Sequence, residues 1–263
     1  MMRTGMRKTR KRWTVFAVVV LFLAASSMTD VARCETAKEI LEKAFDYYRG
    51  ESSETEVDMI IHRPDWERKM TLKGWSKGRE DALFRVIAPA KDAGNGTLKK
   101  DREMWTYNPK VNRVIKIPPS MMSQAWMGSD FSNDDLAKSD TILQDYTHEM
   151  MGVASQDNHK VYTIKLMPRP NAPVVWGMQH MKIRDDHILL QQSFFDEDMQ
   201  LVKAMTTSDI VMLGGKLFPR IWYMRKGEDP DEYTQVIYKE AKFDIPITDG
   251  FFSISNLKDP RVR

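Results

Sequence analysis

Cysteine is nearly absent from this sequence, since Cys34 is the only one among 263 residues. An internal disulfide is therefore excluded, and the fold must be stabilised by packing. Histidine is scarce as well. The five histidines are scattered, no two have metal-ligand spacing on a helix, and no second cysteine exists to complete a zinc site. We expect neither a metal nor another cofactor.

Motifs of reaction centres are also missing. Residues 94–97 lack the lysine and the glycine spacing that hold phosphates. Ser129 and His148 would be the pair for a serine hydrolase, but the serine lacks the Gly-x-Ser-x-Gly elbow. Asp130 and residues 133–135 lack the EF-hand spacing, which favours helix capping or a solvent-exposed face for them. The sequence predicts no catalytic residue, so binding is the leading class of function.

Charge of one sign is not in large excess either. The sequence has 40 Lys and Arg against 37 Asp and Glu, a formal net charge of +3. Seven basic residues and one acidic residue lie within residues 1–34, so the remainder carries 33 basic and 36 acidic residues. We expect no nucleic-acid partner, because the basic excess belongs to the N-terminal segment.

That N-terminal segment has the pattern of a secretory signal peptide. Six basic residues up to Arg12 precede an uncharged apolar run over residues 15–25, and small residues follow. The run is shorter than the roughly 20 residues that span a bilayer, so an uncleaved membrane anchor is the less favoured alternative. We predict a signal peptide over residues 1–34 and export from the cytoplasm, with cleavage after Cys34 preferred to cleavage after Ser27.

A lipid-modified Cys34 is disfavoured, because Arg33 stands where lipoprotein signals need a small residue.

The rest of the chain shows no internal boundary. No linker rich in Gly, Ser or Pro follows, and a single domain is predicted over residues 35–263.

Residues 36–50 have the pattern of an amphipathic helix that packs on a sheet. Thr36 and Glu39 have the spacing of a capping box, and Gly50 is suited to end the helix. The apolar stripe of this helix consists of Ile40, Leu41, Ala44, Phe45 and Tyr48.

From Glu54 onward, apolar and polar residues alternate with period two between recurring turn residues, which is typical of antiparallel strands. Strands are expected over residues 54–62, 67–76, 82–88, 95–99, 103–108, 112–117, 145–152, 160–167, 174–184, 187–196, 200–210, 217–226 and 232–243. So many consecutive strands with short connections favour a strongly curved sheet or an incomplete barrel.

One long connection, between Ile117 and Asp145, interrupts the strands. Its apolar residues include Met121, Met122, Trp126, Met127 and Phe131. A connection of this length is usually functional or has a helix of its own. We predict a short amphipathic lid across the mouth of the sheet, and a helix that plugs the core is the equally weighted alternative.

Methionine is abundant, because fifteen of the 19 methionines follow residue 34. Its unbranched side chain repacks around irregular apolar ligands at low cost, and acyl chains are such ligands. A curved sheet with a lid would form a concave apolar cavity for them. The alternative is that these side chains fill the interior of the sheet themselves.

Residues 104–109, Met-Trp-Thr-Tyr-Asn-Pro, resemble the Leu-Trp-x-Tyr-Asn-Pro strand and turn of the LolA-like outer-membrane lipoprotein-sorting protein family. Further stretches that look typical of this family are 61–66, 84–86, 110–122, 126–136, 145–147 and 243–252. The resemblance covers essentially all of residues 36–258.

The resemblance implies a mainly β (α+β) fold, an unclosed and strongly curved antiparallel β-barrel of about 11–13 strands with an N-terminal helix and a helical lid. It implies a periplasmic, non-enzymatic and monomeric carrier that holds lipoprotein acyl chains or phospholipid. The implied partners are an inner-membrane RND-type or ABC-type transporter and an outer-membrane acceptor. An accessory module of an RND-type envelope transport complex is the alternative.

The same resemblance suggests which residues form the site. We expect the cavity and the lid to use Trp105, Tyr107, Ile117, Met121, Met122, Trp126, Met127 and Phe131. In this family an arginine latches the lid, and Arg79 is its near match here.

Overall fold

The computed structural model describes residue 1 and residues 35–137, 141–227 and 230–259. Apart from Met1, the expected signal peptide and its cleavage site lie outside this part of the chain. The residues from Thr36 onward form a compact unit of their own. Within the described ranges, no helix is both long and apolar enough to cross a membrane.

Helix α1 (Ala37–Arg49) occupies the region in which the sequence predicts a helix. The Thr36 hydroxyl accepts the Glu39 N–H at 3.2 Å, and the Glu39 carboxylate accepts the Thr36 N–H at 2.8 Å, which confirms the capping box. Gly50 ends the helix with a φ of 66°, a conformation that glycine adopts without steric cost. The buried face of α1 packs against β7 and β9.

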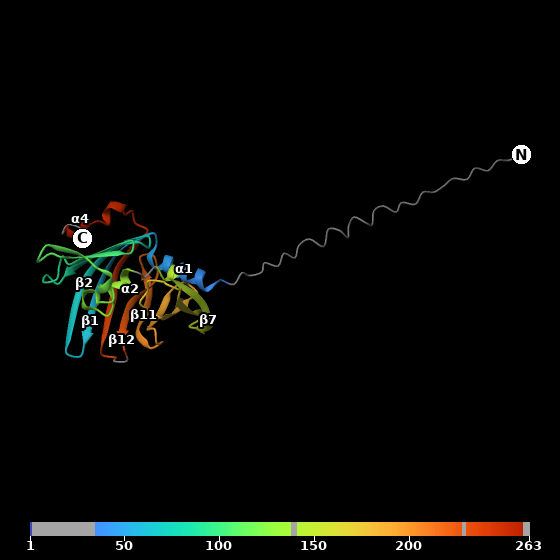
Figure 1. Ribbon diagram of the computed structural model, residues 1–263. Coiled ribbons are helices and arrows are strands. Elements are labelled where there is room, and N and C mark those ends of the chain that lie inside the picture. Colours follow the sequence, from blue (N-terminus) through green and yellow to red (C-terminus); the bar gives the residue numbers. More distant parts are fainter. Residues whose placement is uncertain (2–34, 138–140, 228–229, 260–263) are drawn as a thin grey trace. The chain divides into compact units, whose positions relative to one another are not determined.

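The strands of the described residues form one antiparallel sheet of thirteen strands, in the order β6-β5-β4-β3-β2-β1-β13-β12-β11-β10-β9-β8-β7. Their bounds are β1 (Ser52–Arg63), β2 (Trp66–Lys77), β3 (Asp81–Ala88), β4 (Gly96–Lys100), β5 (Glu103–Asn108), β6 (Arg113–Lys116), β7 (Tyr146–Gln156), β8 (His159–Pro168), β9 (Met178–Arg184), β10 (Leu189–Phe195), β11 (Leu201–Leu213), β12 (Lys216–Lys226) and β13 (Tyr233–Phe243). Strands β6 and β7 are the two edges, so the sheet is unclosed (Figure 1).

This architecture confirms the predicted fold class, and each expected strand is present. The largest differences are at residues 174–184, where β9 begins only at Met178, and at residues 145–152, where β7 continues to Gln156. The period-two pattern locates strands well, whereas their ends depend on which backbone groups find a partner in the ladder.

Alternate residues of each strand point to opposite faces of the sheet. On β5, Met104 packs with residues of β1–β3 and with the connection that follows β6, whereas its neighbour Trp105 packs with Phe252 and Leu257. We call the face with Met104 the inner face and the face with Trp105 the outer face. The inner face is covered by α1 and by the connection between β6 and β7.

A C-terminal segment covers the outer face of β3–β5. Helix α4 (Ile254–Lys258) places the buried Leu257 so close to Gly96 that a Cβ on this glycine would lie 2.8 Å from Leu257 Cδ1. The buried Arg85 on β3 donates to the carbonyls of Asn256 and Leu257 at 2.6 and 2.9 Å. These bonds satisfy carbonyls at the end of α4 and fix the segment to the sheet.

Glu54 on β1 lies among hydrogen-bond donors from the two neighbouring strands. Trp75 Nε1 donates to its carboxylate at 3.1 Å, and the ammonium groups of Lys73 and Lys242 both lie 3.3 Å from it. Burial raises the pKa of the Glu54 carboxyl, but these donors together outweigh it and hold the pKa below its ordinary value.

A carboxyl with a lowered pKa stabilises the fold above its ordinary pKa, and this contribution is lost as the pH falls through the folded-state pKa. We expect Glu54→Gln to lower the free energy of unfolding by about 1 kcal/mol at pH 7 and by much less at about pH 3. Urea denaturation at both pH values measures the two losses, with Glu240→Gln at an exposed position of β13 as the control. An equal loss at both pH values would contradict the assignment.

Candidate ligand-binding cavity

The lid segment, defined as residues 117–137 and 141–145, crosses the inner face of the sheet. Its short helices are η2 (Pro119–Met121), η3 (Trp126–Gly128), α2 (Asn133–Ala137) and α3 (Ile142–Asp145). The Trp126 N–H donates to the Phe131 carbonyl at 2.7 Å, and the Asp134 N–H donates to the Met122 carbonyl at 2.8 Å. These bonds fold the segment back on itself.

The first half of the lid segment fills the inner face over β1–β5. Met122 and Trp126 are buried there against Met59, Met70 and Met104. Trp126 Nε1 also donates to Thr97 Oγ1 on β4 at 3.0 Å, and its ring packs edge-on against Phe84. This half of the segment plugs the core, as the alternative interpretation of the sequence predicts.

A buried ion pair attaches the lid segment to β1. The Arg63 guanidinium binds both carboxylate oxygens of Asp130, at 2.8 and 3.2 Å. Asp130 is only 2% exposed, and its carboxylate also accepts the Thr234 hydroxyl of β13 at 2.7 Å. Each oxygen of Asp130 therefore has a donor.

A second ion pair attaches α2 to β11. The Lys203 ammonium binds Oδ2 of Asp135, and the same oxygen accepts the N–H of Ser132 at 2.7 Å. The Lys203 side chain is 1% exposed, and its ammonium lies 4.8 Å from the ring centre of Trp176 and 5.0 Å from that of Phe194. Burial lowers the pKa of Lys203, and the Asp135 carboxylate opposes this effect.

The acidic residues of the lid segment therefore do not form a solvent-exposed face, which corrects that part of the expectation. Asp130 and Asp134 are buried, and the Asp135 carboxylate is 8% exposed. Helix capping is confirmed, because Ser132 and Asp135 bond each other's backbone N–H at the start of α2. The sequence pattern could not reveal the burial, since the cationic partners lie on distant strands.

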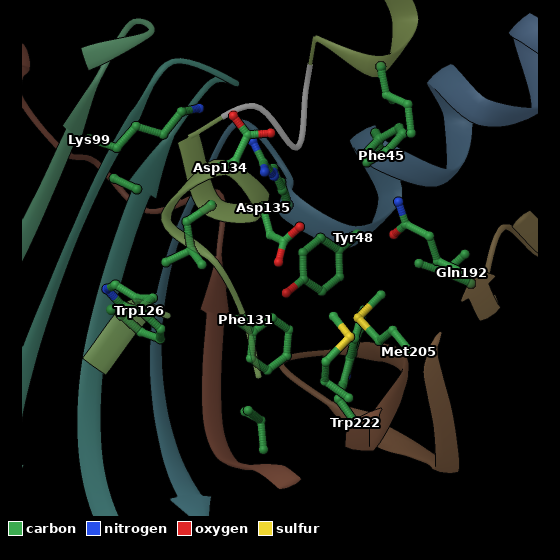
Figure 2. A pocket seen from close by; sticks show the side chains of 18 of the residues that line it. Phe45, Tyr48, Lys99, Trp126, Phe131, Asp134, Asp135, Gln192, Met205 and Trp222 are labelled. Carbon is green, nitrogen blue, oxygen red and sulfur yellow. The ribbon is translucent and has the colours of Figure 1, made fainter. Parts of the chain in front are cut away.

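A cavity of about 280 Å³ lies between the lid segment, α1 and the inner face of strands β1–β4 and β9–β13. Its apolar lining includes Ala44, Phe45, Tyr48, Phe131, Phe194, Met205, Trp222, Met224 and Val236. Figure 2 shows Tyr48, Phe131, Met205 and Trp222 pointing into the same space. The volume is near the lower end of the roughly 300–1,000 Å³ that is common for ligand sites, so the cavity could enclose a slender apolar group.

Polar groups occupy another part of the lining. Lys99, Asp134 and Asp135 lie together, apart from Met205 and Trp222 (Figure 2). Tyr146, which also lines the cavity, donates to the Trp176 carbonyl at 3.2 Å, and burial raises its pKa to about 12. This phenol therefore stays neutral and carries no charge to a ligand at neutral pH.

The structure divides the eight predicted site residues into three groups. Trp126 and Phe131 line the cavity. Trp105 and Tyr107 point to the outer face, where they pack with the C-terminal segment. The other four predicted residues, which lie between the lid segment and β1–β5, are Ile117, Met121, Met122 and Met127.

Arg79, the near match to the family's latch arginine, lies on the turn between β2 and β3. Its guanidinium contacts the Asp46 carboxylate of α1 at 2.5 Å. The cations that form the buried contacts with carboxylates of the lid segment include Arg63 and Lys203.

Ser129 and His148 are bonded to the main chain. Ser129 Oγ donates to the Trp126 carbonyl at 2.7 Å, and His148 Nε2 lies 2.9 Å from the Ile142 carbonyl oxygen.

One group of potential metal ligands lies at the turn after β9. His159, Asp185 and Asp186 have ligand atoms within 4.8 Å of one another. His159 already contacts Asp185 at 2.7 Å, and Arg184 binds both oxygens of Asp186 at 2.5 and 2.8 Å. We assign no metal to these residues.

Sequence reasoning missed Arg63, Lys203 and the α1 residue Tyr48 as parts of the site. The sequence could have indicated that Lys203 points inward, because side chains two positions apart in a strand share a face and Met205 is apolar. A lysine on an inward-facing position indicates a buried partner. Arg63 offers no comparable signal, since it ends a strand beside a turn.

The unclosed, curved sheet with helices on its inner face is a LolA-like fold. The described chain is similar in structure to a DUF1329 family protein from Desulfovibrio piger, with a TM-score of 0.75, 22% identity, and coverage of 84% of this chain and 97% of the other. It is also similar to a putative outer membrane lipoprotein-sorting protein domain from Vibrio parahaemolyticus, with a TM-score of 0.74, 17% identity, and coverage of 85% and 98%. A LolA superfamily protein from Nitrosomonas europaea is similar with a TM-score of 0.71 and 22% identity, and the match covers 85% of this chain and 100% of the other.

A family model described as an uncharacterized protein matches residues 78–259, more than half of the chain. The chain belongs to this family. Its resemblance in fold to LolA-like proteins is confirmed. No curated protein matches the sequence.

Asp130→Asn would leave the partly buried Arg63 without its carboxylate. We expect this variant to lose about 2–3 kcal/mol of unfolding free energy, because an uncompensated charge remains next to the lid segment. The double variant Arg63→Met, Asp130→Asn should lose less than the sum of the two single variants. Urea denaturation of the four proteins measures the coupling, and strictly additive losses would show that the pair does not act as a unit.

Proposed function

We propose that the protein is an exported, periplasmic carrier that binds acyl chains of lipoproteins or lipids and takes part in outer-membrane lipoprotein sorting or lipid transport. The observation that carries this proposal is the cavity of about 280 Å³ lined by α1, the lid segment and strands β1–β4 and β9–β13. Its apolar lining suits an acyl chain, and the LolA-like fold supports a carrier role.

The physical driving force would be burial of methylene groups, at about 0.8 kcal/mol for each one. A bilayer offers the same burial, so the carrier needs a donor that releases the chain and an acceptor that takes it over. We propose an inner-membrane RND-type or ABC-type transporter as donor and an outer-membrane site as acceptor. Because the cavity is small, a long acyl chain would also require the lid segment to move away from β10–β13.

Binding of this kind needs no chemical step, and we propose that the protein is not an enzyme. The phenols that face the cavity support this view. Tyr146 is held neutral by burial, and the Tyr48 and Tyr238 hydroxyls bond each other at 2.5 Å. Burial also raises the pKa of Tyr238 well above its ordinary value. The phenols of Tyr146 and Tyr238 are therefore not suited to act as bases at neutral pH.

The test is native mass spectrometry of the protein purified without detergent, followed by extraction of bound molecules and by uptake from phospholipid vesicles. We expect bound acyl-chain lipid in the wild type. Met205→Trp should lower uptake at least about tenfold, because the indole would occupy the space of the ligand next to Trp222.

Met212→Trp is the matched control, since Met212 lies on the same strand as Met205 but is 65% exposed. It should bind lipid like the wild type. A wild-type protein that carries no lipid and takes up none from vesicles would overturn the carrier function.

A second candidate function, an accessory module of an RND-type transport complex, is favoured by one observation. Met122 and Trp126 of the lid segment fill the inner face over β1–β5 with the chain's own side chains. A self-filled interior suits a scaffold better than a carrier. Absence of lipid uptake together with retained folding would favour this candidate.

A further inference from the structure

Strand β7 is a long edge of the sheet and, among the described residues, pairs on one side only (Figure 1). Every residue from Met151 to Gln156 is exposed, and Met151 and Val153 are 51% and 55% exposed. No charged residue and no proline lies within residues 150–156. An exposed edge strand of this composition is a template for pairing with another strand.

The opposite edge of the sheet is protected against such pairing. Strand β6 (Arg113–Lys116) is short, and a cation stands at each of its ends. Shortness and charge both keep an edge from pairing, and so does a β-bulge. The bulge of β7 lies between Met150 and Gly152, before the exposed half of the strand. Residues 152–156 then pair with β8 in regular register, so this stretch has none of the three protections.

The pairing with β8 determines which main-chain groups of β7 face the free side. The Lys160 carbonyl on β8 accepts the Asp185 N–H at 2.8 Å, so the main chain of Lys160 bonds away from β7. Lys160 is directly opposite Ser155, and opposite residues of an antiparallel pair exchange both hydrogen bonds or neither. The N–H and C=O groups of Ser155 therefore point to the free side. Those of Val153, two positions earlier, do the same.

We propose that two copies of this chain pair antiparallel through residues 152–156 of β7, about a two-fold axis at Ala154. In this register Val153 of one copy is opposite Ser155 of the other, and each such pair exchanges both main-chain hydrogen bonds. Ala154 is opposite its own equivalent as a non-hydrogen-bonded pair, where the small side chain permits close approach. The two Val153 side chains meet diagonally and bury apolar surface.

A second copy suits this edge because the edge is complementary to itself. The acidic residues that flank the uncharged stretch, Glu149 and Asp157, do not face each other in this register, since Asp157 is opposite Met151 of the second copy. Pairing of β7 with β6 of another copy would instead be limited to the short cationic strand. The two-fold contact is closed, so it uses up the free edge and does not propagate.

This dimer differs from the monomer that the family resemblance implies. It does not depend on the proposed function, because none of residues 152–156 lines the cavity. The pairing joins the sheets of two copies and leaves each cavity with its own lining.

The association state of the purified protein tests the inference. A single strand pair buries less than the roughly 1,200 Å² of a standard interface, so we expect a reversible dimer that forms within about 10–500 µM. Sedimentation velocity over this range should show the average mass rising from monomer toward dimer.

Val153→Lys should raise the dissociation constant at least about tenfold, because two ammonium groups would meet diagonally across the pair. Met212→Lys is the matched control. It places the same charge at an exposed apolar position of β11 and should dimerise like the wild type.

A disulfide reports the register of the pair. In a Cys34→Ser background, Ala154→Cys provides the only cysteine and places it at the two-fold axis. Opposite residues of a non-hydrogen-bonded pair have Cα atoms about 4.5 Å apart, which is within the range of a disulfide. We expect Ala154→Cys to form a covalent dimer under mild oxidation. Thr147→Cys, at an exposed position of β7 outside the paired stretch, should stay monomeric.

Three outcomes would overturn the inference. A wild-type protein that stays monomeric over the whole range would leave the edge to a strand of a different protein. A dimer that Val153→Lys does not weaken would place the contact on another surface. Equal cross-linking of Thr147→Cys and Ala154→Cys would show that the two copies do not meet in this register. The carrier function is decided separately, by lipid uptake.

Discussion

The structure depends on covering the inner face of a sheet whose edges do not pair. Strands β6 and β7 end the sheet on either side, so its curvature alone cannot exclude water from that face. Two elements do so instead, α1 over β7–β9 and the lid segment over β1–β5. The cavity lies next to both, because together they do not fill the interior of the sheet completely.

Apolar packing gives the lid segment its affinity for the sheet, and ion pairs determine where it lies. Dispersion and burial are non-directional, so short helices rich in methionine could settle in several positions. The bidentate contact between Arg63 and Asp130 and the contact between Lys203 and Asp135 each require one geometry. Buried pairs of this kind contribute little net stability, but in this protein they specify one arrangement of the segment on β1 and β11.

The sequence predicts the strands and α1 well because both follow from local patterns, period two for strands and a capping box for the helix. It predicts the site less well. The motif at residues 104–109 draws attention to Trp105 and Tyr107, yet strand parity turns these residues outward and leaves Met104 on the inner face. The two ion pairs join residues 67 and 68 positions apart, a distance at which no local pattern connects Arg63 with Asp130 or Asp135 with Lys203.

The two free edges also determine how the molecule can change its interior volume. In a closed barrel, widening the lumen would require breaking hydrogen bonds between neighbouring strands, because every strand is paired on both sides. Here β6 and β7 each pair on one side only, so a change in the distance between these two edges would break no bond of the strand ladders. Such a change would be opposed by the contacts of the lid segment and α1 with the inner face of the sheet. In an unclosed sheet of this kind, the covering elements and not the strand pairing therefore set the interior volume.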